Sequence, residues 1–346
     1  MKAGTVARFL AGATATVLAA GCLERKETIR IAPDGAVHVE LEYSGETQQF
    51  ETADALPGPA AGWAVQRKVK REDNDKETTT LTARRSFEPR EKLPASFAAL
   101  DDPDADLYLA FPTTVELERR ADGLYMHFRR TYVARPWAYV QFWQDQFVDD
   151  DIKQRADKPL EELTPEDRVR IVKAFAGFES FKQMELLQSA IKRLGADVSQ
   201  DAWLRARQAL LEVGEDTDWD AVVERVGGLA EDERDEAFEA ESQRLLDRTY
   251  RAFVDELATA ADWNQQQTQR FEAAYARAKK HYQITSEVGG HAFRITVHMP
   301  GDIVADNADK RDDDGALLWE FSGEAFRDRA YELMATAKLS GKGNDR

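Results

Sequence analysis

The spacing of apolar residues changes twice along this chain, and this change constrains the fold more than any other feature of the sequence. From 28 to 134 most apolar residues alternate with polar ones, as in "VHVELEY" at 37–43. A period of two is typical of strands with one buried face. From 136 to 284 apolar residues recur every three or four positions, which is typical of amphipathic helices. After Gly289 and Gly290 the alternation returns, in "HAFRITVHMP" and "ALLWEF".

This order predicts an α+β protein with a discontinuous, mainly antiparallel sheet domain and a large all-helical insertion. The simplest geometry pairs the late strands with the early ones in the same sheet. We expect the N-terminal part of the sheet domain at 22–135, the helical insertion at 136–284 and the C-terminal part at 285–340. The polar segment 341–346 is expected to be a disordered tail.

Individual elements are predicted from turns and apolar stripes. The turns "PDG" (33–35), "EDND" (72–75) and "ADG" (121–123) each join two predicted strands. Helices of the insertion are predicted at 137–155, 165–194, 199–213, 217–228, 231–260 and 263–284. Outside the insertion we expect short helices at 90–100 and 324–337 and a strand at 106–112.

The first 21 residues are typical of a signal peptide. Lys2 and Arg8 accompany an apolar run at 9–20, which is shorter than the roughly 20 residues of a membrane-spanning helix. Small residues at 19–21 then precede Cys22, the only cysteine of the chain. The stretch Ala-Ala-Gly-Cys resembles the lipobox of bacterial lipoproteins, which a type II signal peptidase cleaves.

The lipobox resemblance implies cleavage after Gly21 and attachment of diacylglycerol, with a further acyl chain such as palmitate, at Cys22. Two or more acyl chains hold a protein stably at a membrane, whereas one chain binds only marginally. Leu23 follows the cysteine, in place of the aspartate that retains many such lipoproteins in the inner membrane. The resemblance therefore favours the outer membrane within the cell envelope. Without lipidation, the same segment would be an ordinary secretory signal.

The C-terminal strands carry a second resemblance. Between His298 and Phe321 the sequence contains Met-Pro-Gly at 299–301, followed by Asn307 and Trp319. This stretch is similar to the C-terminal hairpin of LppM-like bacterial lipoproteins. The resemblance implies a secreted, β-rich module and no particular activity.

Composition and motifs exclude several functions. The chain has 47 basic and 64 acidic residues, and its net charge of −17 does not suit nucleic acid. It has no G-x-S-x-G nucleophile motif and no glycine-rich phosphate loop. His291 and His298 are seven residues apart on a predicted strand and so face opposite ways. The acids before Gly315 lack the first and last ligands of an EF-hand loop. We expect no metal and no cofactor.

Paired arginines on the predicted strands form one candidate binding surface. Because strand side chains alternate, about half of the basic residues should share one face. We expect these side chains to pair with acids of the insertion or to be solvated. The alternative is a basic face that contacts anionic headgroups or an anionic polymer beside the tether. The candidate residues are Arg84, Arg85, Arg129 and Arg130.

The stretch "WAYVQFW" at 137–143 is the second candidate, for a ligand groove. Its aromatic residues are too many for a single helical stripe, so some should lie outside the core of the insertion. They would either pack between the insertion and the sheet or line a groove for a glycan, lipid or peptide. The candidate residues are Trp137, Tyr139, Phe142 and Trp143.

These features favour a membrane-anchored envelope lipoprotein that acts as a non-catalytic interaction or structural module. Its partner would be an envelope protein, a glycan or a lipid, in addition to the membrane itself. The alternatives are a hydrolase with a site assembled from scattered residues, and a periplasmic carrier of lipids or small ligands. A buried carboxylate in a deep cleft would favour the enzyme, a large dry cavity the carrier, and an exposed apolar patch the interaction module.

Overall fold

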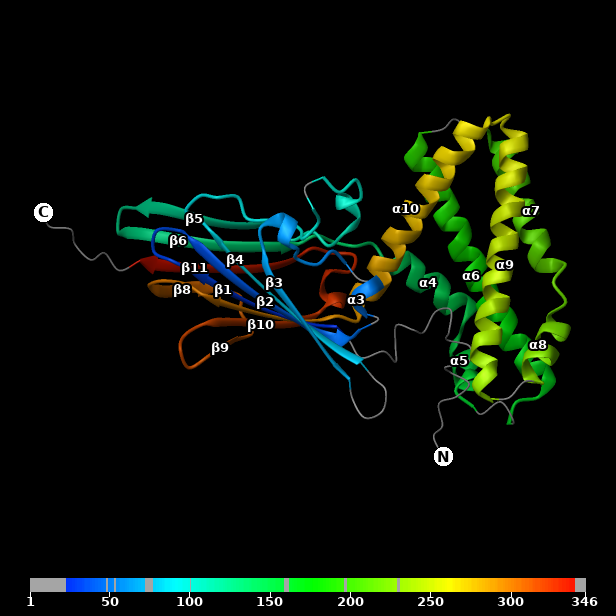
Figure 1. Ribbon diagram of the computed structural model, residues 1–346, viewed down its shortest axis with the longest axis horizontal. Helices are drawn as coiled ribbons and strands as arrows, with labels where there is room; N and C mark the ends of the chain where they lie inside the picture. Colours follow the sequence, from blue (N-terminus) through cyan, green and yellow to red (C-terminus); the bar gives the residue numbers. More distant parts are fainter. Residues whose placement is uncertain are drawn as a thin grey trace, which may run out of the picture. The chain divides into compact units, whose positions relative to one another are not determined.

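The chain divides into two compact units in the computed structural model. The model describes residues 23–47, 49–52, 54–71, 77–99, 101–158, 162–195, 198–228 and 231–339. Residues 138–282 form the helical unit, and the described residues of 23–137 and 283–339 form the β unit (Figure 1). The predicted signal peptide, Gly21, Cys22 and the tail at 341–346 lie outside the described residues.

The larger sheet of the β unit has seven strands in the order β3-β4-β2-β1-β7-β10-β9. Its strands are β1 (Glu24–Ile31), β2 (Val37–Glu46), β3 (Ala64–Arg71), β4 (Glu77–Phe87), β7 (Ala292–His298), β9 (Lys310–Arg311) and β10 (Leu317–Ser322). A short helix, α3 (Gln49–Thr52), follows β2. Strands β1 and β7 are parallel, with Glu24 opposite Ala292. This pair joins the part of the sheet before the helical unit to the part after it.

A second sheet has four strands in the order β5-β6-β11-β8. Its strands are β5 (Thr113–Arg120), β6 (Gly123–Tyr132), β8 (Asp302–Asp306) and β11 (Tyr331–Leu339). All its pairs are antiparallel, and Leu124 of β6 lies opposite Leu339 of β11. The predicted α+β class with mainly antiparallel strands is confirmed, although the strands form two sheets and not one.

The two sheets of the β unit share one hydrophobic core. Buried residues of the larger sheet, such as Ile29 and Val39, belong to the same cluster as Phe128 and Leu333 of the smaller sheet. The rings of Phe128 and Trp319 lie 6.3 Å apart between centroids. The sheets therefore pack face to face, as in a β-sandwich.

The predicted helix at 324–337 is wrong. A single 3₁₀ turn covers Gly323–Phe326, and Tyr331–Leu339 is strand β11, which pairs with β6 on one side and β8 on the other. Leu333, Ala335 and Ala337 alternate into the core. Alanine, leucine and methionine favour helices locally, but two neighbouring strands satisfy the backbone of this segment in the sheet.

The predictions at 90–100 and 106–112 are also wrong. Residues 90–99 form turns and bends, and 106–112 contain the end of a 3₁₀ helix (Ala105–Leu107) followed by irregular chain. The two segments contact each other, because the N–H of Phe111 donates to the carbonyl oxygen of Ala95 at 2.6 Å. Their apolar side chains cover the core without regular structure, so neither helical nor strand spacing identifies them.

The helical unit is built from α4 to α10. The helices are α4 (Ala138–Phe147), α5 (Asp150–Ala156), α6 (Pro165–Leu194), α7 (Gln200–Glu215), α8 (Trp219–Gly227), α9 (Glu231–Ala260) and α10 (Gln265–Gly289, of which 265–282 belong to this unit). The largest cluster of its core lies between α6, α7, α9 and α10 and contains Leu187, Leu210, Phe253 and Phe271. Within its described helices, none combines the length and apolar character needed to cross a bilayer.

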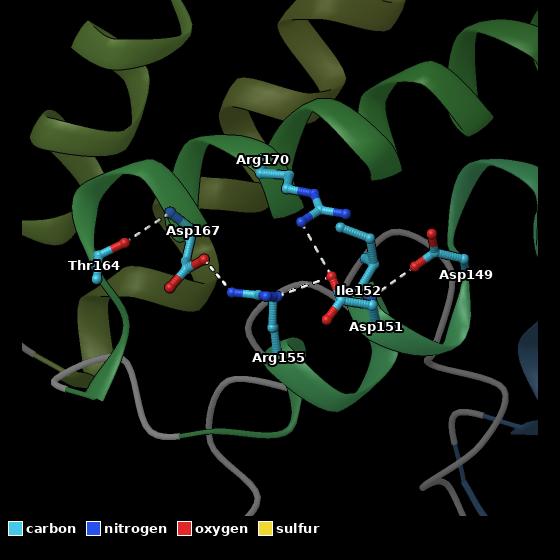
Figure 2. A network of polar contacts seen from close by, with 7 residues as sticks. All are labelled: Asp149, Asp151, Ile152, Arg155, Thr164, Asp167 and Arg170. Carbon is cyan, nitrogen blue, oxygen red and sulfur yellow. Dashed lines mark hydrogen bonds and ion pairs between the residues drawn. The ribbon is translucent and has the colours of Figure 1, made fainter.

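The helix predicted at 137–155 is divided in two at Asp149. The Asp149 carboxylate accepts the backbone N–H of Ile152 at 2.9 Å and so begins α5 as its N-cap. A polar network then fastens α5 to α6 (Figure 2). Arg155 lies between Asp151 and Asp167 and pairs with both, and Arg170 lies 3.1 Å from Asp151.

Candidate functional site

An open groove of about 620 Å³ in the helical unit is the leading candidate site. Its walls come from α4, α6, α7 and the start of α8. Its lining includes six aromatic side chains: Tyr139, Trp143, Phe147, Phe181, Trp203 and Trp219. We call this groove, with all of its lining residues, the aromatic groove.

Regular spacing on α4 builds one wall of the aromatic groove. Tyr139, Trp143 and Phe147 are four residues apart and therefore share one face of the helix. All three surround Phe181 of α6, with ring centroids 5.8, 5.0 and 6.0 Å from it, respectively. Gly177 allows this approach, because a Cβ there would lie 2.9 Å from the Phe147 ring.

The opposite wall comes from α7. Trp203, Arg207, Leu210 and Leu211 follow three- and four-residue steps and line the groove. The Trp203 ring also meets Phe253 of α9 edge to face at 5.4 Å. The indole therefore packs against the core cluster of the helical unit.

Charged residues of both signs surround the apolar lining. Lys173 and Arg207 provide positive charge, and Glu185 and Glu215 provide negative charge. Burial raises the pKa of Glu185, and the charge of Lys192 opposes this shift. A mixed rim does not select a ligand of one strong charge, such as an anionic polymer.

The predicted aromatic residues are only partly brought together. Tyr139 and Trp143 line the aromatic groove, and Phe142 is 54% exposed and contacts Trp143 at 5.5 Å without lining the groove. Trp137 belongs to the β unit, where it is buried with its ring 4.5 Å from the Arg327 guanidinium. The expectation that Trp137 lines the same groove is wrong, because Trp137 is the last residue of the β unit before the helical unit begins at Ala138.

Sequence reasoning missed the other aromatic residues of the groove. Phe147 could have been found, since it continues the four-residue spacing of Tyr139 and Trp143. Phe181, Trp203 and Trp219 lie on three other helices, and nothing in their spacing indicates that they face one groove.

The predicted basic residues do not share one face. Arg84 and Arg85 lie on β4 of the larger sheet, whereas Arg129 and Arg130 lie on β6 of the smaller one. Arg84 pairs with Glu40, Arg85 with Glu91 and Arg129 with Glu332. The first three arginines thus have acidic partners within the β unit itself.

Arg130 is not a surface residue, which corrects the prediction made for it. It is 4% exposed, and its Nη1 lies 2.7 Å from Oε2 of Glu27, which also pairs with Arg25 at 3.0 Å. Burial alone would raise the pKa of Glu27, but the charges of Arg130 and Arg25 outweigh burial and lower this pKa. The strand alternation of β6 turns Arg130 inward between the sheets. Across the described part of the chain, no three His, Cys, Asp or Glu residues converge as metal ligands.

The fold defines an α+β protein with a β-sandwich unit and a helical unit that carries the aromatic groove. No known protein family matches the chain. No curated protein matches it either. Among solved structures, the chain is similar to the NMR structure of the folded domain of LppM from Mycobacterium tuberculosis, with 10% identity, a TM-score of 0.28 and 93% of each chain covered. A similarity at this level carries no argument for function.

Proposed function

We propose that this protein is a lipid-anchored lipoprotein of the bacterial cell envelope that binds a partner protein through the aromatic groove and performs no catalysis. The observation that carries the proposal is the open groove of about 620 Å³ with six aromatic side chains in its lining. This volume falls within the roughly 300–1,000 Å³ of ordinary ligand pockets.

The composition of the groove supports a protein segment as the occupant. Tyrosine, tryptophan and arginine are enriched at the centres of protein interfaces, and all three line this groove. The apolar floor and the rim of mixed charge match the anatomy of such interfaces. An amphipathic helix of the partner, with its apolar face in the groove, has the required chemistry.

The position of residue 23 determines how a lipid anchor at Cys22 would join the β unit. Leu23 is 2% exposed, its carbonyl oxygen accepts the Ala292 N–H at 3.1 Å, and β1 begins at Glu24. A lipidated Cys22 would therefore join the membrane to the β unit with almost no linker. This short connection would keep the β unit beside the headgroups, and Leu23 after the cysteine favours the outer membrane.

Mass spectrometry of the protein from its native host tests the anchor. We expect a chain that begins at Cys22 with diacylglycerol and an acyl chain, and we expect Cys22→Ser to move the protein from the membrane to the soluble fraction. An uncleaved N-terminus, or an unmodified Cys22, would overturn the anchor while leaving the groove untouched.

Photo-crosslinking in the native envelope tests the groove. p-Benzoylphenylalanine in place of Tyr139 should give one protein adduct, because this residue lines the groove. The same reagent in place of Gln146, exposed on α4 outside the groove lining, is the matched control and should give none. Trp143→Ala should abolish the adduct while circular dichroism shows an unchanged helix content. Equal adducts from both positions, or adducts with lipid or glycan alone, would contradict a protein partner.

A further inference from the structure

Glu185 of α6 lines the aromatic groove as an acid without a partner. Its side chain is partly buried, and among the described residues its carboxylate forms neither an ion pair nor a hydrogen bond. Neither carboxylate oxygen is sealed from solvent. A group that enters the groove can therefore reach this carboxylate.

The charge of Glu185 is only weakly compensated within the described part of the helical unit. The positive charge that opposes the raised pKa of Glu185 is that of Lys192. Lys192 follows seven residues later on α6, which is about 10 Å along the helix axis. Arg207 also lines the groove, but it neither pairs with Glu185 nor contributes to the shift of its pKa. A cation supplied by a ligand would stabilise the ionised carboxylate.

Aromatic rings lie beside the place where such a cation would bind. Phe181 is four residues before Glu185 and therefore shares its face of α6. The rings of Tyr139 and Trp143 lie 5.8 and 5.0 Å from the Phe181 ring. Their own planes are 79° apart, so the pair presents ring faces in two directions, and Tyr139 is 55% exposed. Ring faces of this kind attract cations.

The opposite wall of the groove adds a further ring. Trp203 of α7 lines the groove with Glu185 and packs against the same core cluster as Leu187, two residues after Glu185. Both walls thus carry aromatic side chains around a single accessible carboxylate. A guanidinium group matches this combination better than an ammonium group, because its flat face stacks on rings while its N–H groups pair with a carboxylate.

We infer that the aromatic groove binds an arginine side chain of the partner segment, with the guanidinium paired to Glu185 and stacked on the groove's aromatic rings. The inference rests on the proposed function for the partner, although the site itself can be tested without one. The mixed rim is compatible with a single bound cation. Lys173 lies twelve residues before Glu185, about 18 Å along α6, and is too distant to repel it strongly.

Two probes of matched shape isolate the charge. 1-Pentylguanidinium and 1-pentylurea have the same planar head and the same number of heavy atoms, but only the first is a cation at neutral pH. Binding to the full chain is followed by ¹⁹F NMR of 5-fluorotryptophan, with substitution by phenylalanine to assign Trp143 and Trp203. The guanidinium should bind about tenfold more tightly than the urea, as expected for a charged hydrogen bond beside ring faces. Equal affinities, or no saturable shift with either probe, would overturn the inference.

Two substitutions test the assignment to Glu185. Glu185→Gln keeps the shape of the side chain and should reduce the preference for the guanidinium about fivefold or more, because ring faces alone hold a cation weakly. Glu215→Gln removes an exposed acid of the same groove and is the matched control, which should keep the preference. An undiminished preference in Glu185→Gln, or an equal loss in both variants, would show that Glu185 is not the site.

Photo-crosslinking in the native envelope separates this inference from the proposed function. With p-benzoylphenylalanine in place of Tyr139, the additional change Glu185→Gln should remove most of the protein adduct. An adduct that Glu185→Gln leaves unchanged would overturn the arginine site while the partner protein stands. If no adduct forms with Glu185 intact, the proposed partner fails, and the result of the probe titration decides the guanidinium site by itself.

Discussion

Glu27 on β1 and Arg130 on β6 form a 2.7 Å ion pair between the two sheets, with side chains only 1% and 5% exposed. Arg25 lies 3.0 Å from the same carboxylate, so two guanidinium groups share one acid in the core. The Arg25 guanidinium also lies 4.8 and 4.7 Å from the ring centroids of Phe97 and Phe111. These aromatic faces stabilise the second positive charge by cation–π interaction.

Glu27→Gln should destabilise the β unit strongly. The substitution leaves two buried guanidinium groups without a counter-charge, and breaking such a pair typically costs about 3–5 kcal/mol. Urea unfolding followed by circular dichroism measures the change. Glu40→Gln is the matched control, because Glu40 pairs with Arg30 and Arg84 on an exposed face. Exposed pairs contribute roughly 0–1 kcal/mol, so similar losses in the two variants would contradict a structural role for the buried pair.

His291 should remain neutral in the folded protein well below its ordinary pKa. Burial and the nearby charge of Arg25 lower its pKa from 6.5 to about 4. The unfolded chain binds the proton first as the pH falls, so stability decreases from pH 6.5 toward pH 4. The loss at pH 4.5 is roughly 2–3 kcal/mol.

NMR titration of the ring protons, with His291→Gln to assign the signal, should show a midpoint near pH 4 for His291. The same variant should lose most of this pH dependence in urea unfolding. A midpoint near 6.5 would show that the ring is solvated.

Two glycines should respond to alanine in opposite ways. A Cβ at Gly323 would collide with the carbonyl oxygen of Val288, whereas a Cβ at Gly214 in α7 would meet open space. Gly323→Ala should destabilise the β unit by about 1–3 kcal/mol through overpacking. Gly214→Ala should stabilise the helical unit slightly, by at most roughly 0.5 kcal/mol, because alanine favours the helix more than glycine does and Gly214 lies near the end of α7. Thermal unfolding of both variants measures whether the first substitution destabilises the protein and the second stabilises it. A stabilised Gly323→Ala variant would disprove the collision.

Asp149→Ala should destabilise the helical unit by about 1 kcal/mol through loss of the N-cap of α5. Asp150→Ala, at the next position, should have a smaller effect, because the Asp150 side chain is 91% exposed and makes only an exposed ion pair with Lys153. Chemical denaturation of the two variants side by side makes the comparison. A loss at Asp150 as large as that at Asp149 would mean that general charge, and not capping, stabilises α5.

Long periodic segments were predicted well from the sequence. The helices expected at 165–194 and 231–260 coincide with α6 and α9, because many apolar residues and clear ends define each stripe. The strand at 37–43 lies within β2 for the same reason. Short segments were predicted less well. Residues 331–339 became strand β11 only through pairing with β6 and β8, which lie far away in the sequence.

The candidate site shows the same limit. Four-residue spacing indicates that Tyr139, Trp143 and Phe147 share a helix face, but the groove needs Phe181 and Trp203 from other helices. Arg130 has a charge that predicts exposure, yet the register of β6 places it opposite Glu27 in the core. Neither relationship can be read locally, because each partner is more than thirty residues away.

The amino-acid sequence by itself determined the α+β class and the order of strand-rich and helix-rich segments, because these depend on the local spacing of apolar residues. Only the tertiary structure decided that there are two sheets, that β1 and β7 run in parallel, and that Glu27 is buried with Arg130. These features depend on contacts between distant segments. Their stability comes from burial and hydrogen bonds that exist only after the chain has folded.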